Sequence, residues 1–312
     1  MIDVILKRHI DVIRASYDVA LSVINYIDDL KGHVIEGIVS SAMTHQLGNA
    51  TSKIEGFLED FHFKTVETER MVSTILQHSL AEVRERETQF LLENFPGFRE
   101  PQLSPVSGAF INGVHYAEWI PSIFVPLRRD VVGAYRLGIT NNHSPLDIVK
   151  KMSGDPKMGH KDSLFQRTKN KIFSLARTLV LQTANDERIS FYKRNPNRFN
   201  SIAWVNPFGN GADTVDGTRT GDYYSIPDLN GSNKSYVWSG SLVHFNSRST
   251  QVPIYSDEVI VKEQLERWFG TRDELYQKEV LGNKKHNLWR SGKLTKTQTF
   301  DLTRTRIPVT AL

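Results

Sequence analysis

Two long helical segments are predicted by the hydrophobic pattern of the first 93 residues or so. Apolar residues recur at steps of three or four positions, a spacing that places them on one side of a helix. In the first segment, Asp28-Asp29 and Lys31-Gly32 predict a break, after which helix resumes near Val34. The predicted apolar face of that segment is Ile2, Leu6, Ile10, Ile13, Tyr17, Leu21, Ile24 and Ile27.

The second helical segment begins near Thr51 and carries its own apolar series. Its end is highly charged, from Glu82 to Glu87, which predicts a solvent-facing surface with ion pairs between neighbouring turns. A projecting polar arm and an ordinary helical bundle are both compatible with this pattern. The predicted apolar positions are Ile54, Leu58, Phe61, Val66, Met71, Ile75, Leu80 and Val83.

Glycine and proline mark the next boundaries along the chain. The stretch from 94 to 113 contains several of both and predicts a linker, followed by helix over 116–138. Ser144-Pro145 has the composition of a helix start, and that short helix is expected to stop at Gly154. The strongest helix prediction of the chain covers 162–192 and ends before Asn195-Pro196.

From 197 to 253 glycines alternate with β-branched and aromatic residues, a composition typical of short strands and turns. Strands are predicted near 201–205 and 235–238, and further helices at 260–269, 273–281 and 284–289. The pattern therefore predicts a mainly helical α+β protein: a helical N-terminal region, then a helical domain with a small β-hairpin and loop subdomain. The expected regions are 1–95, 108–256 and 257–312.

Composition narrows the class of protein. The chain has no cysteine, which excludes disulfides and thiolate chemistry, and its apolar runs are too short to span a bilayer. The opening residues do not resemble a secretory signal. The net charge is +4, and cations are concentrated at the C-terminal end, where they favour contact with phosphate or an acidic protein surface, or form a solvated tail. These basic residues are Lys284, Lys285, Arg290, Lys293, Lys296, Arg304 and Arg306.

Residues capable of chemistry do not form a recognisable catalytic pattern. The ten histidines are scattered without metal-ligand spacing, and the glycine-rich stretches at 209–211 and 231–234 lack the spacing of a phosphate-binding loop. Ser249-Thr250-Gln251 is compatible with an ADP-ribosyltransferase strand, but no Glu-x-Glu follows it. We expect no enzyme activity, metal or cofactor.

Seven separate stretches between residues 108 and 301 resemble, in the right order, the phage head-morphogenesis (Mu F-like minor head protein) family. They include Glu118-Trp119, the helix with Ala176-Arg177-Thr178 and Ala184 to Arg188, and the loop His244 to Thr250. The N-terminal hundred residues share only their helical character with that family. The motif residues are Trp119, Arg177, Thr178, Asn185, Arg188, Trp204, Asp216, Arg219, Thr220, His244, Asn246, Arg248 and Gly282.

This resemblance implies a structural protein of the virion, made in the host cytoplasm and located in the phage head at the portal vertex. The implied partners are the portal protein, other head proteins or copies of itself, and packaged double-stranded DNA, with no membrane. The implied roles are head morphogenesis and DNA packaging or ejection. A nucleic-acid-binding accessory protein outside the virion is the alternative, and an ADP-ribosyltransferase is a third hypothesis.

Family members often carry cysteines in two loops where this chain has Ser247 and, near 222–224, Asp-Tyr-Tyr. We therefore expect aromatic packing and hydrogen bonds to hold these loops in place of a metal or disulfide. Arginines 177, 188 and 248 are expected to fasten the loop region to the long helix through its carbonyls or through Asp213 and Asp216. Trp119, Trp204 and Trp268 are expected to be core anchors.

Overall fold

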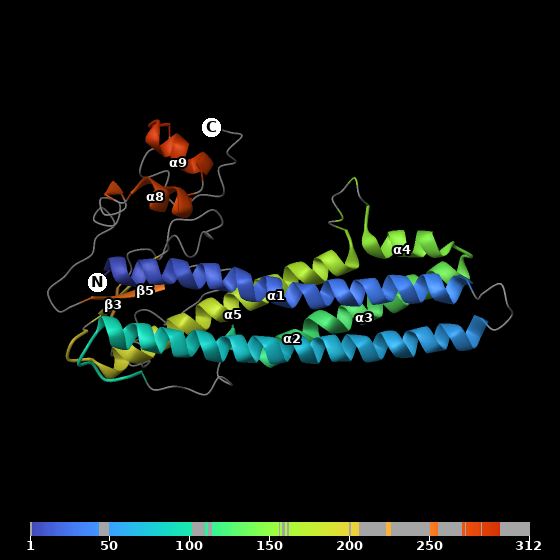
Figure 1. Ribbon diagram of the computed structural model, residues 1–312, viewed down its shortest axis with the longest axis horizontal. Coiled ribbons are helices and arrows are strands. Elements are labelled where there is room, and N and C mark those ends of the chain that lie inside the picture. The colour runs from blue at the N-terminus through green and yellow to red at the C-terminus, as the bar shows by residue number, and fades with distance from the viewer. Residues whose placement is uncertain are drawn as a thin grey trace. The chain divides into compact units, whose positions relative to one another are not determined.

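The computed structural model (Figure 1) confirms a mainly helical α+β fold. It describes residues 2–43, 50–101, 110–111, 114–155, 157, 160, 162–199, 201–205, 223–225, 250–254, 270–271, 273–281 and 283–293. The helices are α1 (Ile2–Met43), α2 (Ala50–Asn94), α3 (Tyr116–Thr140), α4 (Pro145–Ser153), α5 (Leu164–Arg194), α8 (Glu274–Leu281) and α9 (Asn283–Arg290).

The strands form two small antiparallel sheets. The first pairs β1 (Phe110–Ile111) with β2 (Val114–His115), and the second has the order β4-β3-β5, from Tyr223–Ser225, Ser201–Val205 and Thr250–Ile254. In its register, Ser201 lies opposite Ser225 on one side and Ile254 on the other. Strand β3 was predicted, β4 and β5 were not, and the predicted strand at 235–238 lies outside the described residues.

Contacts divide the chain into two compact units that are each built from separate segments. Unit 1 contains Met1–Arg14, Val83–Pro105 and Val180–Leu312, and unit 2 contains Ala15–Glu82 and Val106–Leu179. Helices α1, α2 and α5 each contribute one part to unit 1 and the other to unit 2. The units therefore do not follow the three consecutive regions expected from sequence, because long helices contribute to both.

Helix α1 is continuous, so the predicted break near Gly32 is wrong. Its buried face is also rotated from the predicted one: Tyr17 is 36% and Leu21 54% exposed. The reason is that the buried row includes polar side chains, which a hydrophobic pattern assigns to solvent. That row is Ile5, His9, Val12, Ser16, Ala20, Val23, Ile27, Leu30, Val34 and Ile38.

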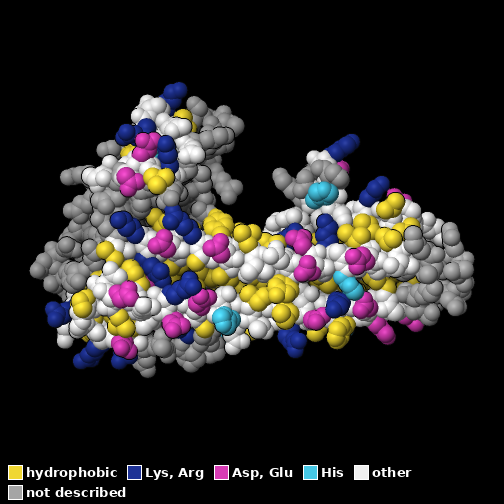
Figure 2. All heavy atoms as spheres, viewed as in Figure 1, with side chains coloured by type: hydrophobic (Ala, Val, Ile, Leu, Met, Phe, Trp, Pro, Cys, Tyr) yellow, Lys and Arg dark blue, Asp and Glu magenta, His cyan; other side chains and the backbone are white. Residues whose placement is uncertain are grey.

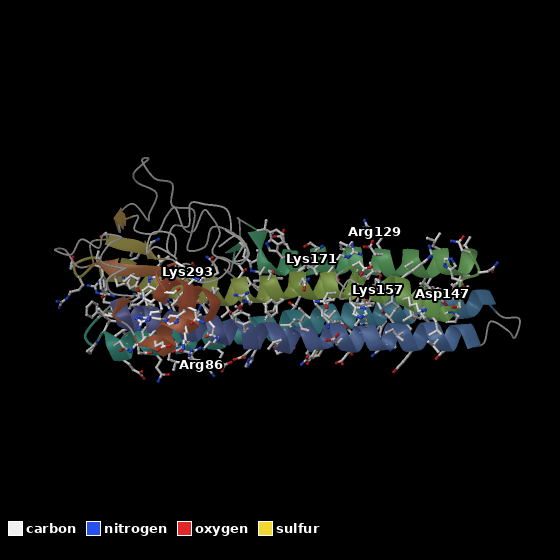
Figure 3. All side chains as sticks on the ribbon, turned by 90° about the horizontal axis from the view of Figure 1, so that it is seen from above. Arg86, Arg129, Asp147, Lys157, Lys171 and Lys293 are labelled. Carbon is white, nitrogen blue, oxygen red and sulfur yellow. The ribbon has the colours of Figure 1, made fainter. Side chains whose placement is uncertain are left out.

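Helix α2 differs from the prediction at its charged end. Arg84 and Glu87, predicted to face solvent, are buried, whereas Arg86 between them is exposed and lies on the outside (Figure 3). The stretch after α2 is also more than a linker, since Phe95 is buried. Both corrections concern unit 1, where polar and aromatic partners come from distant parts of the chain.

Unit 2 is a helical bundle in which charged side chains join neighbouring helices. Lys169 of α5 forms an ion pair with Asp28 of α1, and Arg128 of α3 lies 2.8 Å from Glu69 of α2. Trp119, expected in the core, is only half-buried because it lies in the first turns of α3, whose buried face is carried by neighbours such as Ile120 and Ile123.

The turn between α3 and α4 is specified locally, as predicted. The Ser144 hydroxyl caps α4 by accepting from the Asp147 amide at 3.2 Å, and Pro145 occupies the first turn. Helix α4 ends at Gly154, whose φ of +78° favours glycine. The two helices pack closely because Gly138 of α3 leaves room for the Ile148 side chain.

Charged side chains of both signs are interspersed with hydrophobic ones on the face shown in Figure 2. Most of the large apolar side chains that are exposed among the described residues belong to unit 2, including Phe63 at 65% and Leu146 at 65%. None of the described helices has the length and apolar character needed to cross a bilayer.

Gly138→Ala is expected to lower the free energy of unfolding by about 1–3 kcal/mol, because a Cβ there would meet Cδ1 of Ile148 at 2.6 Å. Gly133→Ala in the same helix is the matched control: its Cβ would meet nothing within 4 Å, so stability should rise by about 0.5–1 kcal/mol. Urea denaturation measures both. Adding Ile148→Ala should relieve part of the Gly138→Ala loss, and two alanine variants of equal stability would contradict the close packing.

Candidate functional site

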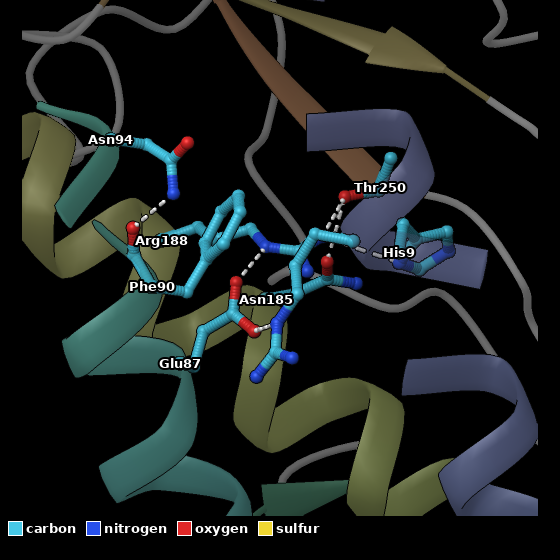
Figure 4. Close-up of polar contacts among 8 residues, drawn as sticks. His9, Glu87, Phe90, Asn94, Asn185, Arg188 and Thr250 are labelled. Carbon is cyan, nitrogen blue, oxygen red and sulfur yellow. Dashed lines mark hydrogen bonds and ion pairs between the residues drawn. The ribbon is translucent and has the colours of Figure 1, made fainter. Parts of the chain in front are cut away.

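A network of buried polar side chains lies at the centre of unit 1 (Figure 4). Its central residue is Arg188 of α5, which is 0% exposed. Its guanidinium donates to Glu87 of α2 at 2.5 Å, to His9 of α1 at 3.2 Å and to Thr250 of β5 at 2.8 Å. One side chain therefore connects four elements that are far apart in the sequence.

Glu87 balances the charge of this arginine and of a second one. Oε1 of Glu87 accepts from Arg188, and Oε2 accepts from Nε of Arg8 at 2.9 Å. The Arg8 guanidinium also lies 5.3 Å from the centre of the Phe90 ring, within cation–π range. Both carboxylate oxygens of this fully buried glutamate are thus used, as burial of a charge requires.

The contact with Arg188 fixes the protonation of His9. A guanidinium can only donate, so Nδ1 of His9 must be the acceptor and carries no proton. His9 is 0% exposed and is therefore buried as a neutral imidazole whose proton is on Nε2.

Thr250 extends the network toward the sheet. Its hydroxyl accepts from Arg188 and donates to Oδ1 of Asn185 at 3.0 Å. Because both partners belong to α5, this hydroxyl fastens the start of β5 to that helix. All three side chains are buried, which makes the directions of the two bonds interdependent.

A second ion pair lies in the same unit, between Arg84 of α2 and Glu187 of α5, with 2.5 Å between Nε and Oε1. Burial raises the pKa of Glu187 to about 7, and the nearby Arg84 charge offsets only part of this effect. Glu187 therefore gains a proton close to neutral pH. Burial also raises the pKa of the Tyr192 phenol, so that group stays protonated.

An aromatic cluster borders the network. Phe98 stacks on Phe199 with 5.4 Å between ring centres, and Phe95 and Phe191 lie 5.7 Å apart. Asn195 anchors the cluster: its side chain accepts from the Arg99 amide at 2.8 Å and donates to the Phe191 carbonyl at 2.9 Å. The segment after α2 is in this way tied to the end of α5.

The structure brings together only some of the predicted motif residues. Asn185 and Arg188 meet in the network, and the charge partner of Arg188 is Glu87; Asp213 and Asp216, its expected partners, lie outside the described residues. Arg177 and Thr178 belong to unit 2, where Arg177 lies 4.0 Å from the Tyr17 ring centre and Thr178 donates to the Ser174 carbonyl at 2.7 Å.

The remaining predicted motif residues have no described side chain. Trp204 lies in β3, but its side chain is not described. The others lie outside the described residues: Asp216, Arg219, Thr220, His244, Asn246, Arg248 and Gly282. The same holds for Trp268, which was predicted to be a core anchor.

The predicted basic surface is described only in part. Arg290 at the end of α9 and Lys293 after it are exposed (Figure 3 shows Lys293), and Lys284 and Lys285 lie in α9 with their side chains not described. Lys296, Arg304 and Arg306 lie outside the described residues. Helices α8 and α9 are joined by a buried contact of 3.3 Å between Oε1 of Gln277 and Nε2 of His286.

Sequence reasoning did not identify His9, Arg8, Arg84 or Glu87 as members of a site. Their local pattern resembles the polar side of a surface helix. The available signal was indirect: Arg188, singled out by its motif, follows the mainly apolar stretch 175–184 of the long helix, and an arginine buried with such a helix needs an acidic partner.

Searches against protein-family models, curated proteins and solved structures each returned no match. In the part of the chain that the structure describes, no three histidine or acidic side chains gather in a way that could hold a metal ion. The chemistry available in the network is thus that of paired guanidinium and carboxylate groups and one neutral imidazole.

Glu87→Leu is expected to lower the free energy of unfolding by about 3–5 kcal/mol, because it leaves Arg188 buried without its carboxylate. Arg188→Met should have a loss of the same order, and the double variant should lose much less than the sum. Arg129→Met is the control: Arg129, labelled in Figure 3, is 78% exposed and pairs with Asp130 at the surface, so its loss should change stability by less than about 1 kcal/mol. Additive losses would show that the two charges do not interact.

Proposed function

We propose that this protein is a structural minor head protein of a tailed bacteriophage. It binds the portal and acts in head morphogenesis and in DNA packaging or ejection, without catalytic activity of its own. The proposal comes from the ordered motifs that resemble the head-morphogenesis family.

One observation supports a structural reading of those motifs. Asn185, Arg188 and Thr250, taken from two of the motif stretches, share one hydrogen-bonded chain and are each 0% exposed. Side chains enclosed in this way hold α5 to β5. In this proposal the motif residues resemble the family because they hold its architecture together, as is expected for a structural protein.

In this proposal two parts of the chain have different partners. The exposed apolar side chains of unit 2, such as Phe63 and Leu146, are suited to contacts with the portal or with neighbouring subunits. The basic end, with Arg290 and Lys293 exposed, is suited to packaged DNA or to an acidic surface of the portal.

The chain is expected to sediment with heads that carry the portal, in lysates of cells producing the phage that encodes it. Immunodetection on gradient-purified heads and mature virions measures this, with the portal protein as internal reference. A chain found only in the soluble fraction, bound to nucleic acid or hydrolysing NAD, would overturn the proposal in favour of the accessory protein or the ADP-ribosyltransferase.

Binding to random duplex DNA is expected to weaken steeply with salt. The logarithm of the affinity should fall with that of the salt concentration, by about 0.9 per phosphate contact. Alanine at Lys284, Lys285, Arg290 and Lys293 should reduce this slope by about 3–4, whereas the same change in charge at four exposed cations of unit 2 should leave it unchanged. These control positions are Arg129, Arg136, Lys150 and Lys151. Equal effects of both variants would exclude the basic end as the DNA contact.

A further inference from the structure

His9 is a titratable side chain in a position where it can act only when neutral. Its Nδ1 accepts from Nη1 of Arg188 at 3.2 Å, and both residues are 0% exposed. An imidazolium has no acceptor nitrogen, and a guanidinium remains charged at every pH that a protein tolerates. A proton on His9 would therefore replace a hydrogen bond by two cations facing each other away from water.

We propose that the His9–Arg188 contact is an acid-sensitive latch, which releases the first turns of α1 from the core of unit 1 when His9 takes a proton. This inference does not depend on the proposed function, since it follows from the contact alone.

The surroundings of His9 strengthen the effect of its protonation. Three arginines face three acidic side chains in this network, Glu87, Asp186 and Glu187. Because the pKa of Glu187 is raised to about 7, that carboxyl is neutral at lower pH, and positive charge is then in excess when His9 takes its proton. Both oxygens of Glu87 already accept from Arg8 and Arg188, so this carboxylate has no oxygen left over for a protonated His9. The charged and titratable groups of the network are Arg8 of α1, Arg84 and Glu87 of α2, and Asp186, Glu187, Arg188 and Tyr192 of α5.

The other interactions that hold the start of α1 define the segment that is released. In unit 1, α1 contributes residues up to Arg14, with Ile5, Leu6 and Val12 buried and Arg8 bound to Glu87. These side chains hold the segment against the repulsion between a protonated His9 and Arg188. Opening is therefore expected to be local and to leave the rest of the chain folded.

Glu187 acts in the opposite direction on the whole unit. Because the folded-state pKa of Glu187 is raised to about 7, its contribution to stability is complete at low pH and is lost as pH rises through that value. Acidification from pH 7.5 to 5.5 thus stabilises the folded unit through Glu187. The same change protonates His9 and weakens the contact that holds the first turns of α1. A global melting temperature mixes the two effects, so the test must observe α1 locally.

Hydrogen exchange of the full chain, followed by mass spectrometry at pH 7.5 and 5.5 and corrected for intrinsic rates, provides that test. With an unperturbed histidine pKa of about 6.5 in the open form, the opening equilibrium of residues 2–14 should rise about tenfold at the lower pH. Residues 23–38 of the same helix are the internal reference and should not change. In His9→Asn, whose side-chain oxygen keeps an acceptor but cannot take a proton, the increase should be absent.

Glu187→Gln keeps the test decisive if His9→Asn does not fold. This variant removes the opposing titration and leaves His9 intact, so the tenfold opening of residues 2–14 should persist. The latch is refuted by a wild-type chain that shows no local increase, by His9→Asn showing the same increase, or by Glu187→Gln abolishing it.

Discussion

Arg188 and Glu87 carry opposite charges into a space that water does not reach, and the arrangement of unit 1 depends on their meeting. Burying either charge alone carries a penalty of several kcal/mol, so a fold that places one inside must also place the other. This requirement links α5 to α2. Arg188 also donates to His9 and Thr250, which links α5 to α1 and β5. The ion pair and these two bonds together determine which surfaces of the four elements face each other.

A buried ion pair contributes less to stability than to the choice between alternative packings, because hydrophobic residues of the same volume would often serve stability equally well. Helices α1 and α2 are long and have many apolar positions, so their hydrophobic rows alone permit several rotations and shifts. Fixed partners at Arg8, His9 and Glu87 select one of these. The rotated face of α1, with Leu21 outside and His9 inside, shows this selection directly.

The two units of the structure differ in how they are held. Unit 2 is a bundle joined by ion pairs at its surface and by close packing such as that of Gly138 on Ile148. Unit 1 combines a charged network, an aromatic cluster and a small sheet, all of which require residues distant in sequence. Unit 1 also contains His9 and Glu187, two buried titratable groups that each contact an arginine, whereas unit 2 has most of the large apolar side chains that are exposed among the described residues.

The sequence by itself determined where most elements begin and end. The cap at Ser144, the stop at Gly154 and the end of α5 before Asn195 follow from local backbone chemistry, which a short window of sequence contains. It also determined the mainly helical α+β class. Only the tertiary structure decided which polar residues lie inside, because Arg8 meets Glu87 across 79 positions and His9 meets Arg188 across 179. A periodic pattern assigns each polar side chain to water unless a partner is known, and these partners come together only when the chain has folded.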